Sequence, residues 1–271
     1  MSHRDHLGIT ISIVLLGLIL AFLIPLPEWR FVFSSFGADI ELYFSALSQL
    51  TALVAGLSCM GTDVVMRDHP RVQGRSLAYT LTFWPLPGAL VALSLALLFR
   101  MRWWSSRFIL VALTGLALAL VILLERYGIE TETGIRDLSH LLLNVVVYIV
   151  ALLAFSALYG AHVQGVLAAA GAFLVGTALA LRPLRQEQRL ARVWLYAALT
   201  GLIMGELMLP LVYCSLSPSV GGAFLFLVFY SVTTLAQREL SDGLQRQDVV
   251  EIVAVFCLGL VLLMGRARGI L

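Results

Sequence analysis

The chain has 271 residues, of which 60% are hydrophobic and 13% are charged, and its formal net charge is +2 at pH 7. Soluble domains carry about twice that charged fraction, so the composition excludes an ordinary soluble domain and predicts an all-α polytopic bundle of transmembrane helices. All 18 residues of the lysine-plus-arginine count are arginines, and the absence of lysine excludes Schiff-base cofactors and Walker-type phosphate loops, which need a lysine amine.

Apolar runs of bilayer length predict about nine spans. The first, about Leu7–Ile24, resembles a signal-peptide core, but Pro25 follows it in place of a small-residue cleavage site, so we expect a retained anchor. A loop over Pro25–Asp39 comes next. The other spans are about Ile40–Met60, Leu77–Phe99, Phe108–Leu124, Ser139–Ala157, Val163–Leu181, Trp194–Cys214, Val220–Leu235 and Val249–Met264. Because the connecting loops are too short to bury a core, we expect residues 1–271 to form one integral membrane domain with no soluble domain.

The third span is ambiguous because Trp84-Pro85-Leu86-Pro87-Gly88 interrupts it. Two prolines this close break or kink a helix. Either an interfacial helix up to Trp84 precedes a short crossing, or the segment is re-entrant. The second alternative would leave eight full spans.

The positions of the arginines predict the orientation of the chain. With nine spans and a cytoplasmic N-terminus, the inside segments hold 12 of the 18 arginines: Arg4, Arg67, Arg71, Arg75, Arg126, Arg136, Arg182, Arg185, Arg189, Arg192, Arg238 and Arg246. The outside segments hold 6: Arg30, Arg100, Arg102, Arg107, Arg266 and Arg268. The positive-inside rule therefore favours nine spans over eight, which would divide the arginines equally.

Glu206 is the candidate functional residue that the hydropathy pattern isolates, since it lies near the middle of an apolar run. A charge at that depth costs about 3 kcal/mol on insertion scales, so it needs a partner or a wet cavity. Either Glu206 titrates inside the bundle or it holds helices together. Gly201 and Gly205 form a GxxxG pair beside it, and Gly165 and Ala169 belong to a small-residue run in the preceding span; both patterns predict close helix packing.

Three further groups of polar residues recur at helical spacing. The second span carries Glu41, Ser45 and Gln49; the fifth carries His140, Asn144 and Tyr148; the eighth carries Tyr230, Thr233, Thr234 and Gln237. Each group is expected to share one helical face. The groups either line a common polar cavity, to which Tyr213 would also belong, or form ordinary interhelical hydrogen bonds.

No motif in the chain indicates a cofactor, a metal or nucleic acid. The sequence lacks HExxH, GxSxG and glycine-rich phosphate loops. Its three cysteines lie far apart in apolar surroundings, which is typical of packing residues. The arginine loops can contact anionic membrane lipids without a dedicated site.

Several aromatic and proline positions carry a family resemblance. Trp84-Pro85-Leu86-Pro87 breaks one span, Trp103-Trp104 precedes the next, and a late hairpin holds Tyr213 and Tyr230. With these features the chain resembles uncharacterised multi-pass bacterial membrane proteins of the domain-of-unknown-function type. The resemblance implies a bacterial inner-membrane location and no activity.

Three hypotheses follow. The first is a non-catalytic membrane component that packs with partner membrane proteins or with further copies of itself. The second is a small permease or proton-coupled transporter that uses Glu206. The third is a membrane enzyme for a lipid or polyprenyl substrate, with Glu41, Asp137 and His140 at the interface; it requires these groups within about one bridging water of each other.

Overall fold

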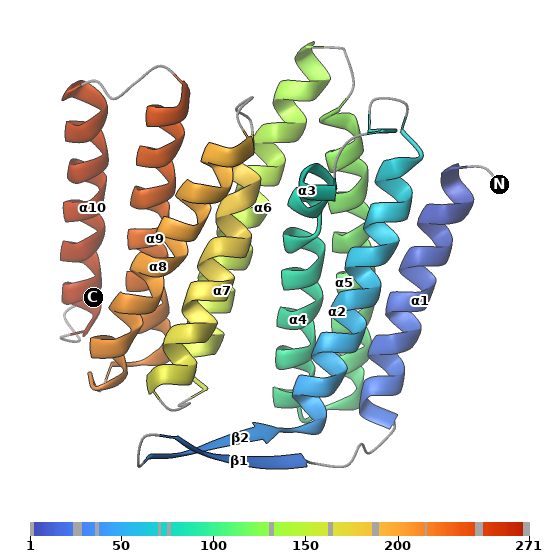
Figure 1. Cartoon of the computed structure of the whole chain (residues 1–271), viewed down its shortest axis with the longest axis horizontal. Helices are drawn as coiled ribbons and strands as arrows, with labels where there is room; N and C mark the ends of the chain where they lie inside the picture. The colour runs from blue at the N-terminus through green and yellow to red at the C-terminus, as the bar shows by residue number, and fades with distance from the viewer. Residues whose placement is uncertain are drawn as a thin grey trace.

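The computed structural model describes residues 3–23, 29–35, 38–69, 72–74, 77–129, 133–161, 165–185, 190–214, 216–241 and 246–267. It confirms the polytopic helical bundle. Eight helical segments in the described chain are long and apolar enough to cross a membrane, and a shorter apolar N-terminal helix lies beside them. Figure 1 shows these helices standing roughly side by side and alternating in direction.

The bundle begins with α1 (His3–Leu23) and a β-hairpin, β1 (Trp29–Ser35) and β2 (Ala38–Phe44), which lies below the helices in Figure 1. The antiparallel register places Trp29 opposite Phe44. The sequence between residues 38 and 44 alternates apolar and polar residues, a period of two that favours a strand. The prediction of a helix from Ile40 was therefore wrong, because average hydropathy does not distinguish a period of two from a buried helix.

The second span is α2 (Ala46–Arg67). Its N-cap is Ser45, whose Oγ accepts a hydrogen bond from the Ser48 backbone N–H at 3.3 Å. An N-cap serine supplies an acceptor to the first turn, where backbone N–H groups have no helical partner. Ser45 thus has a structural role that explains where this helix begins.

The third span consists of a short helix α3 (Leu77–Thr80), a 3-10 turn η1 (Leu81–Phe83) and α4 (Pro85–Arg100). Pro85 stands at the first position of α4, where the missing N–H costs nothing because no carbonyl is available to it. The prolines start this helix and do not kink it. At about 1.5 Å per residue, the 16 residues of α4 rise about 24 Å, and α4 runs most of the depth of the bundle in Figure 1. The segment therefore has the order of the first alternative, a short helix and turn before α4, and residues 77–100 together are long and apolar enough to cross a membrane.

The remaining helices alternate in direction (Figure 1). They are α5 (Trp104–Tyr127), α6 (Thr133–Tyr159), α7 (Gly165–Leu184), α8 (Leu190–Val212), α9 (Pro218–Ser241) and α10 (Arg246–Ala267). The N-terminal end of α1 and the C-terminal ends of α2, α5, α7 and α9 meet at one end of the bundle, uppermost in Figure 1. We call this the arginine-rich end; its described arginines include Arg67, Arg126, Arg182, Arg185 and Arg238.

Close packing joins the helices in the second half of the chain. Helix α8 lies along α7, and α9 lies along α6 and α8. Helix α10 packs on α9 at the edge of the bundle (Figure 1), and Ile252 is the only buried side chain over residues 246–266. The first half of the chain, α1 to α5, joins this group through contacts of α4 and α5 with α6 and α7.

Candidate functional site

Glu206 lies on the exposed side of α8 and not in the interior of the bundle. It shares that side with Leu195, Leu199, Leu202, Leu209 and Tyr213, all exposed, at successive spacings of three and four residues. We call these six residues the Glu206 stripe. Glu206 has no hydrogen bond or ion pair to any described residue. Its position about five residues from the middle of a 23-residue helix places it about 7 Å from the middle of the span.

The glycines beside Glu206 face the other way. A Cβ on Gly201 would approach within 2.5 Å of the Phe173 carbonyl oxygen, and a Cβ on Gly205 would approach within 3.1 Å of the Ala169 carbonyl oxygen. Both carbonyls belong to α7. Gly165, at the start of α7, lies near the Tyr213 hydroxyl, 3.9 Å from where its Cβ would be. The glycine face of α8 therefore packs against α7, which turns Glu206 outward.

The predicted polar groups do not meet at one site. Glu41 lies in β2, so it shares no helical face with Ser45 and Gln49, which lie at the start of α2. The start of α6, which carries Asp137 and His140, is at the opposite end of the bundle from the hairpin (Figure 1). Since α6 alone rises about 40 Å over its 27 residues, residue 41 does not lie beside the start of α6, as the lipid-enzyme hypothesis requires.

Part of the polar pattern does converge between α6 and α9. The Tyr148 ring lies 5.3 Å from the Tyr230 ring, centroid to centroid, and also contacts Phe226 and Phe229 edge-on. One turn earlier on α6, the Asn144 side-chain oxygen is buried with no hydrogen-bond donor among the described residues. His140 lies near the N-terminal end of α6, and its Cε1 is 3.6 Å from where a Cβ on Gly128 would be. The contacts of Tyr148 with α9 are therefore chiefly between aromatic rings.

A buried ion pair at the arginine-rich end was not predicted. Glu125, in the last turn of α5, is 1% exposed, and Arg182, in the last turn of α7, is 2% exposed. The Arg182 Nε lies 3.3 Å from the Glu125 Oε1. The contact is an ion pair outside hydrogen-bond geometry, because neither Glu125 oxygen has a hydrogen-bond donor among the described residues.

Arg185 extends this cluster toward the end of α7. Its guanidinium carbon lies 3.6 Å from the centre of the Phe83 ring and 5.6 Å from that of Tyr79. Both rings come from the α3–η1 segment, so the turn before α4 forms one wall of the cluster. Desolvation lowers the pKa of Arg185, and the charge of Glu125 acts in the opposite direction; a guanidinium nevertheless remains charged at neutral pH.

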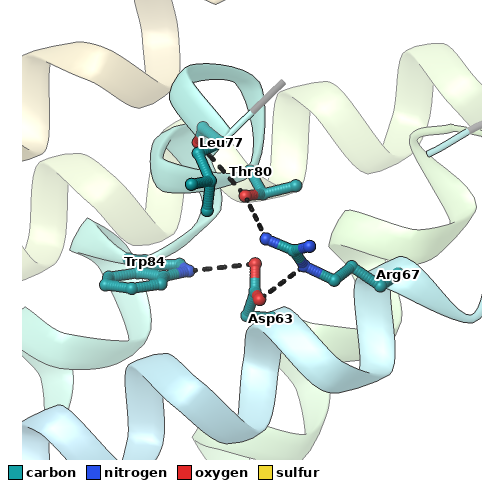
Figure 2. Close-up of polar contacts among 5 residues, drawn as sticks. All are labelled: Asp63, Arg67, Leu77, Thr80 and Trp84. Carbon is teal, nitrogen blue, oxygen red and sulfur yellow. Dashed lines mark hydrogen bonds and ion pairs between the residues drawn. The ribbon is translucent and has the colours of Figure 1, made fainter. Parts of the chain in front are cut away.

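Polar contacts hold the α3–η1 turn in this position, as Figure 2 shows. Asp63 on α2 accepts hydrogen bonds from the Arg67 Nε at 2.6 Å and from the Trp84 indole N–H at 3.4 Å. Arg67 also donates to the Thr80 hydroxyl at 3.4 Å. A second α2 side chain, Cys59, donates to the Trp84 carbonyl oxygen at 3.3 Å. The turn is thereby tied to α2 on one side while it covers Arg185 on the other.

The buried cluster escaped sequence reasoning for a specific reason. The apolar runs end at Leu124 and Leu181, so the predicted spans stop one residue before Glu125 and Arg182. In the structure, α5 and α7 each continue for three residues beyond those points. A signal was available: Glu125 follows Val121, Ile122 and Leu118 on one helical face, a spacing that continues the buried side into the next turn.

No group of three or more histidine, cysteine, aspartate or glutamate side chains within the described residues is placed to hold a metal ion. The candidate groups described above offer electrostatic chemistry. They are the guanidinium donors at the arginine-rich end and the carboxylate of Glu206 on the outside of α8.

Comparison with known proteins identifies one family. The family described as "Protein of unknown function (DUF5656)" matches residues 26–265. No curated protein and no solved structure matches the chain. The match covers the hairpin and every helix from α2 to α9, together with nearly all of α10.

Proposed function

Since the chain belongs to the DUF5656 family, whose function is unknown, we propose from its geometry that it is a non-catalytic component of a membrane-protein assembly. The observation that supports this function is the outward position of Glu206 in the middle of an apolar stripe. The leucines of the stripe suit lipid tails or a partner helix equally well. The carboxylate suits only a partner, because an intramembrane charge with no partner is costly.

The chemistry of the stripe indicates what kind of partner fits. Pro210 has no backbone N–H, so it cannot donate to the carbonyl oxygen of Glu206, four residues earlier. Glu206 therefore offers two hydrogen-bond acceptors to a neighbouring helix: its side-chain carboxylate and its backbone carbonyl, which lacks the usual helical donor. Neither group is a donor. A partner helix that carries a donor such as arginine, histidine, asparagine or serine would complement it.

A second copy of the chain is a poorer partner for this face. In a two-fold symmetric dimer the same surface meets itself, so two Glu206 carboxylates would approach each other. Like charges at short range oppose ionisation of both groups. We therefore favour a different membrane protein as the partner.

The transporter hypothesis has less support. A proton-coupled mechanism that uses Glu206 would need this carboxylate beside the polar groups of α2 and α6, but it lies on the outer side of α8, away from α7. A transport route through one protomer would not pass it.

The test is native mass spectrometry of the protein released in mild detergent from the membranes in which it is made. We expect a defined hetero-complex for the wild type and for Glu239→Gln, a control at an exposed site near the end of α9. We expect Glu206→Leu to dissociate the complex while the isolated protomer remains folded, because Glu206 is exposed and makes no hydrogen bond or ion pair to any described residue.

The same experiment can reject the proposal. A wild-type protein that leaves its own membrane only as a free protomer would contradict it, as would a complex that Glu206→Leu leaves intact. Substrate flux that depends on Glu206 in reconstituted vesicles, without any partner, would favour the transporter instead.

A further inference from the structure

The cluster at the arginine-rich end carries more positive than negative charge. It contains two guanidinium groups, Arg182 and Arg185, and Glu125 is the only carboxylate among the described residues that acts electrostatically on either of them. Asp63, the nearest acid on α2, is engaged by Arg67 and Trp84. Burial of an uncompensated charge is unfavourable, and the described part of the cluster is short of one negative group.

The hydrogen-bond donors of the cluster are also in excess. The Nη1 atoms of Arg182 and Arg185 are both buried, and neither has an acceptor among the described residues. Buried donors are nearly always paired in folded proteins. Two arginine donors without acceptors, in a cluster short of negative charge, fit an anion.

The surroundings of Arg185 hold its guanidinium in a fixed orientation. Arg185 is half-buried at the end of α7, so it forms the boundary between the buried pair and the surface. The Phe83 ring lies against its guanidinium face at 3.6 Å. Stacking on a ring occupies the face of the group and leaves its N–H edge for hydrogen bonds. Tyr79 forms a hydrogen bond with this guanidinium, and the Nη1, which has no acceptor among the described residues, can bind an oxyanion.

We propose that Arg182 and Arg185 form a binding site for a phosphate group at the cytoplasmic ends of α5 and α7. A phosphate offers the several acceptor oxygens that two guanidinium groups require. The site lies at the ends of membrane-spanning helices, the level of lipid headgroups, where basic pockets bind anionic lipids. The phosphate comes either from an anionic phospholipid or from a soluble phosphate compound. The site is independent of the Glu206 stripe, so it can fail while the proposed assembly function holds.

The experiment uses the purified full-length chain, stripped of lipid in a neutral detergent. Native mass spectrometry measures retention of added phosphatidylglycerol against phosphatidylcholine, and thermal unfolding is followed during titration with inorganic phosphate. We expect Arg185→Gln to weaken binding about tenfold or more, the effect of losing a charge-assisted hydrogen bond. The matched control is Arg238→Gln, which removes the same charge from an exposed pair with Asp248 at the same end and should leave binding unchanged.

A second variant distinguishes binding from structural support. Glu125→Gln removes the competing carboxylate, so it should bind phosphate more tightly than the wild type and gain more thermal stability from it, whereas a purely structural ion cluster would gain none. Preference for phosphatidylglycerol with no response to inorganic phosphate identifies a lipid headgroup; saturable stabilisation by inorganic phosphate alone identifies a soluble ligand. Equal binding by Arg185→Gln and Arg238→Gln, or no binding by the wild type, overturns the site.

Discussion

Two glutamates of this protein occupy opposite surroundings, although both stand on apolar helices. Glu125 is buried at the end of α5 against Arg182, at 3.3 Å, while Glu206 is exposed well inside the span of α8. The direction of each side chain follows from its phase on the helix. Glu125 continues the buried face of α5, whereas Glu206 lies opposite the glycine face that α7 covers.

Removal of Arg182 should be strongly destabilising. In Arg182→Met the buried carboxylate of Glu125 loses its nearest cation, and we expect a loss of about 3–5 kcal/mol in unfolding free energy. The double variant Arg182→Met/Glu125→Leu should recover much of this loss, because no carboxylate then remains without its cation. The measurement is reversible unfolding in mixed detergent; a single-variant loss of less than about 1 kcal/mol, typical of exposed ion pairs, would contradict the prediction.

Gly201 should not tolerate a side chain. In Gly201→Ala the new methyl group would meet Thr177 and the Phe173 carbonyl of α7, and overpacking of this kind costs about 1–3 kcal/mol. Gly56→Ala is the control, since nothing lies within 4 Å of a Cβ there, and alanine should be neutral or slightly stabilising in that helix. Equal unfolding midpoints for the two variants would show that α7 and α8 are not in close contact at this level.

At the scale of elements, the α3–η1–α4 segment shows how a break in a helix acquires a role. The prolines permit α4 to begin at Pro85, so the preceding turn is free to fold across the end of the bundle. There its Trp84 indole donates to Asp63 of α2, and its Phe83 ring covers Arg185 of α7. One short turn thus joins α2 to α7.

Weakening the attachment of this turn should loosen it locally. Trp84→Phe keeps an aromatic ring but removes the donor to Asp63. We expect faster amide hydrogen exchange over residues 77–84, with a global loss of no more than about 1 kcal/mol, the typical contribution of one hydrogen bond. Exchange in α9, which does not touch the turn among the principal helix contacts, serves as the internal control. Unchanged exchange over residues 77–84 would mean that the hydrogen bond does not hold the turn.

For the whole molecule, the alternating helices place the described arginines unequally between the two ends. The two ends of the described chain lie on opposite faces, with α1 beginning at the arginine-rich end and α10 ending at the other (Figure 1). From this inequality the positive-inside rule predicts that the arginine-rich end faces the cytoplasm.

Cys214 provides a direct test of this orientation. It is exposed in the turn after α8, at the end opposite the arginine-rich one. A membrane-impermeant maleimide should therefore label it in intact cells, whereas Cys59 is half-buried within α2 and Cys257 lies within the span of α10. Cys214→Ser should abolish the labelling. Labelling that appears only after the membrane is permeabilised would invert the topology.

The sequence by itself determined the class of the protein, the places of most spans and the start of α4, because bilayer-length apolar runs and prolines act locally. The β-hairpin was missed, since residues 40–44 adjoin a long apolar run and were averaged into one predicted helix without regard to their period of two. Only the tertiary structure decided which way Glu206 points and that Glu125 meets Arg182, 57 positions along the chain. Both outcomes depend on which helix packs against which, and that choice is made by contacts between distant segments.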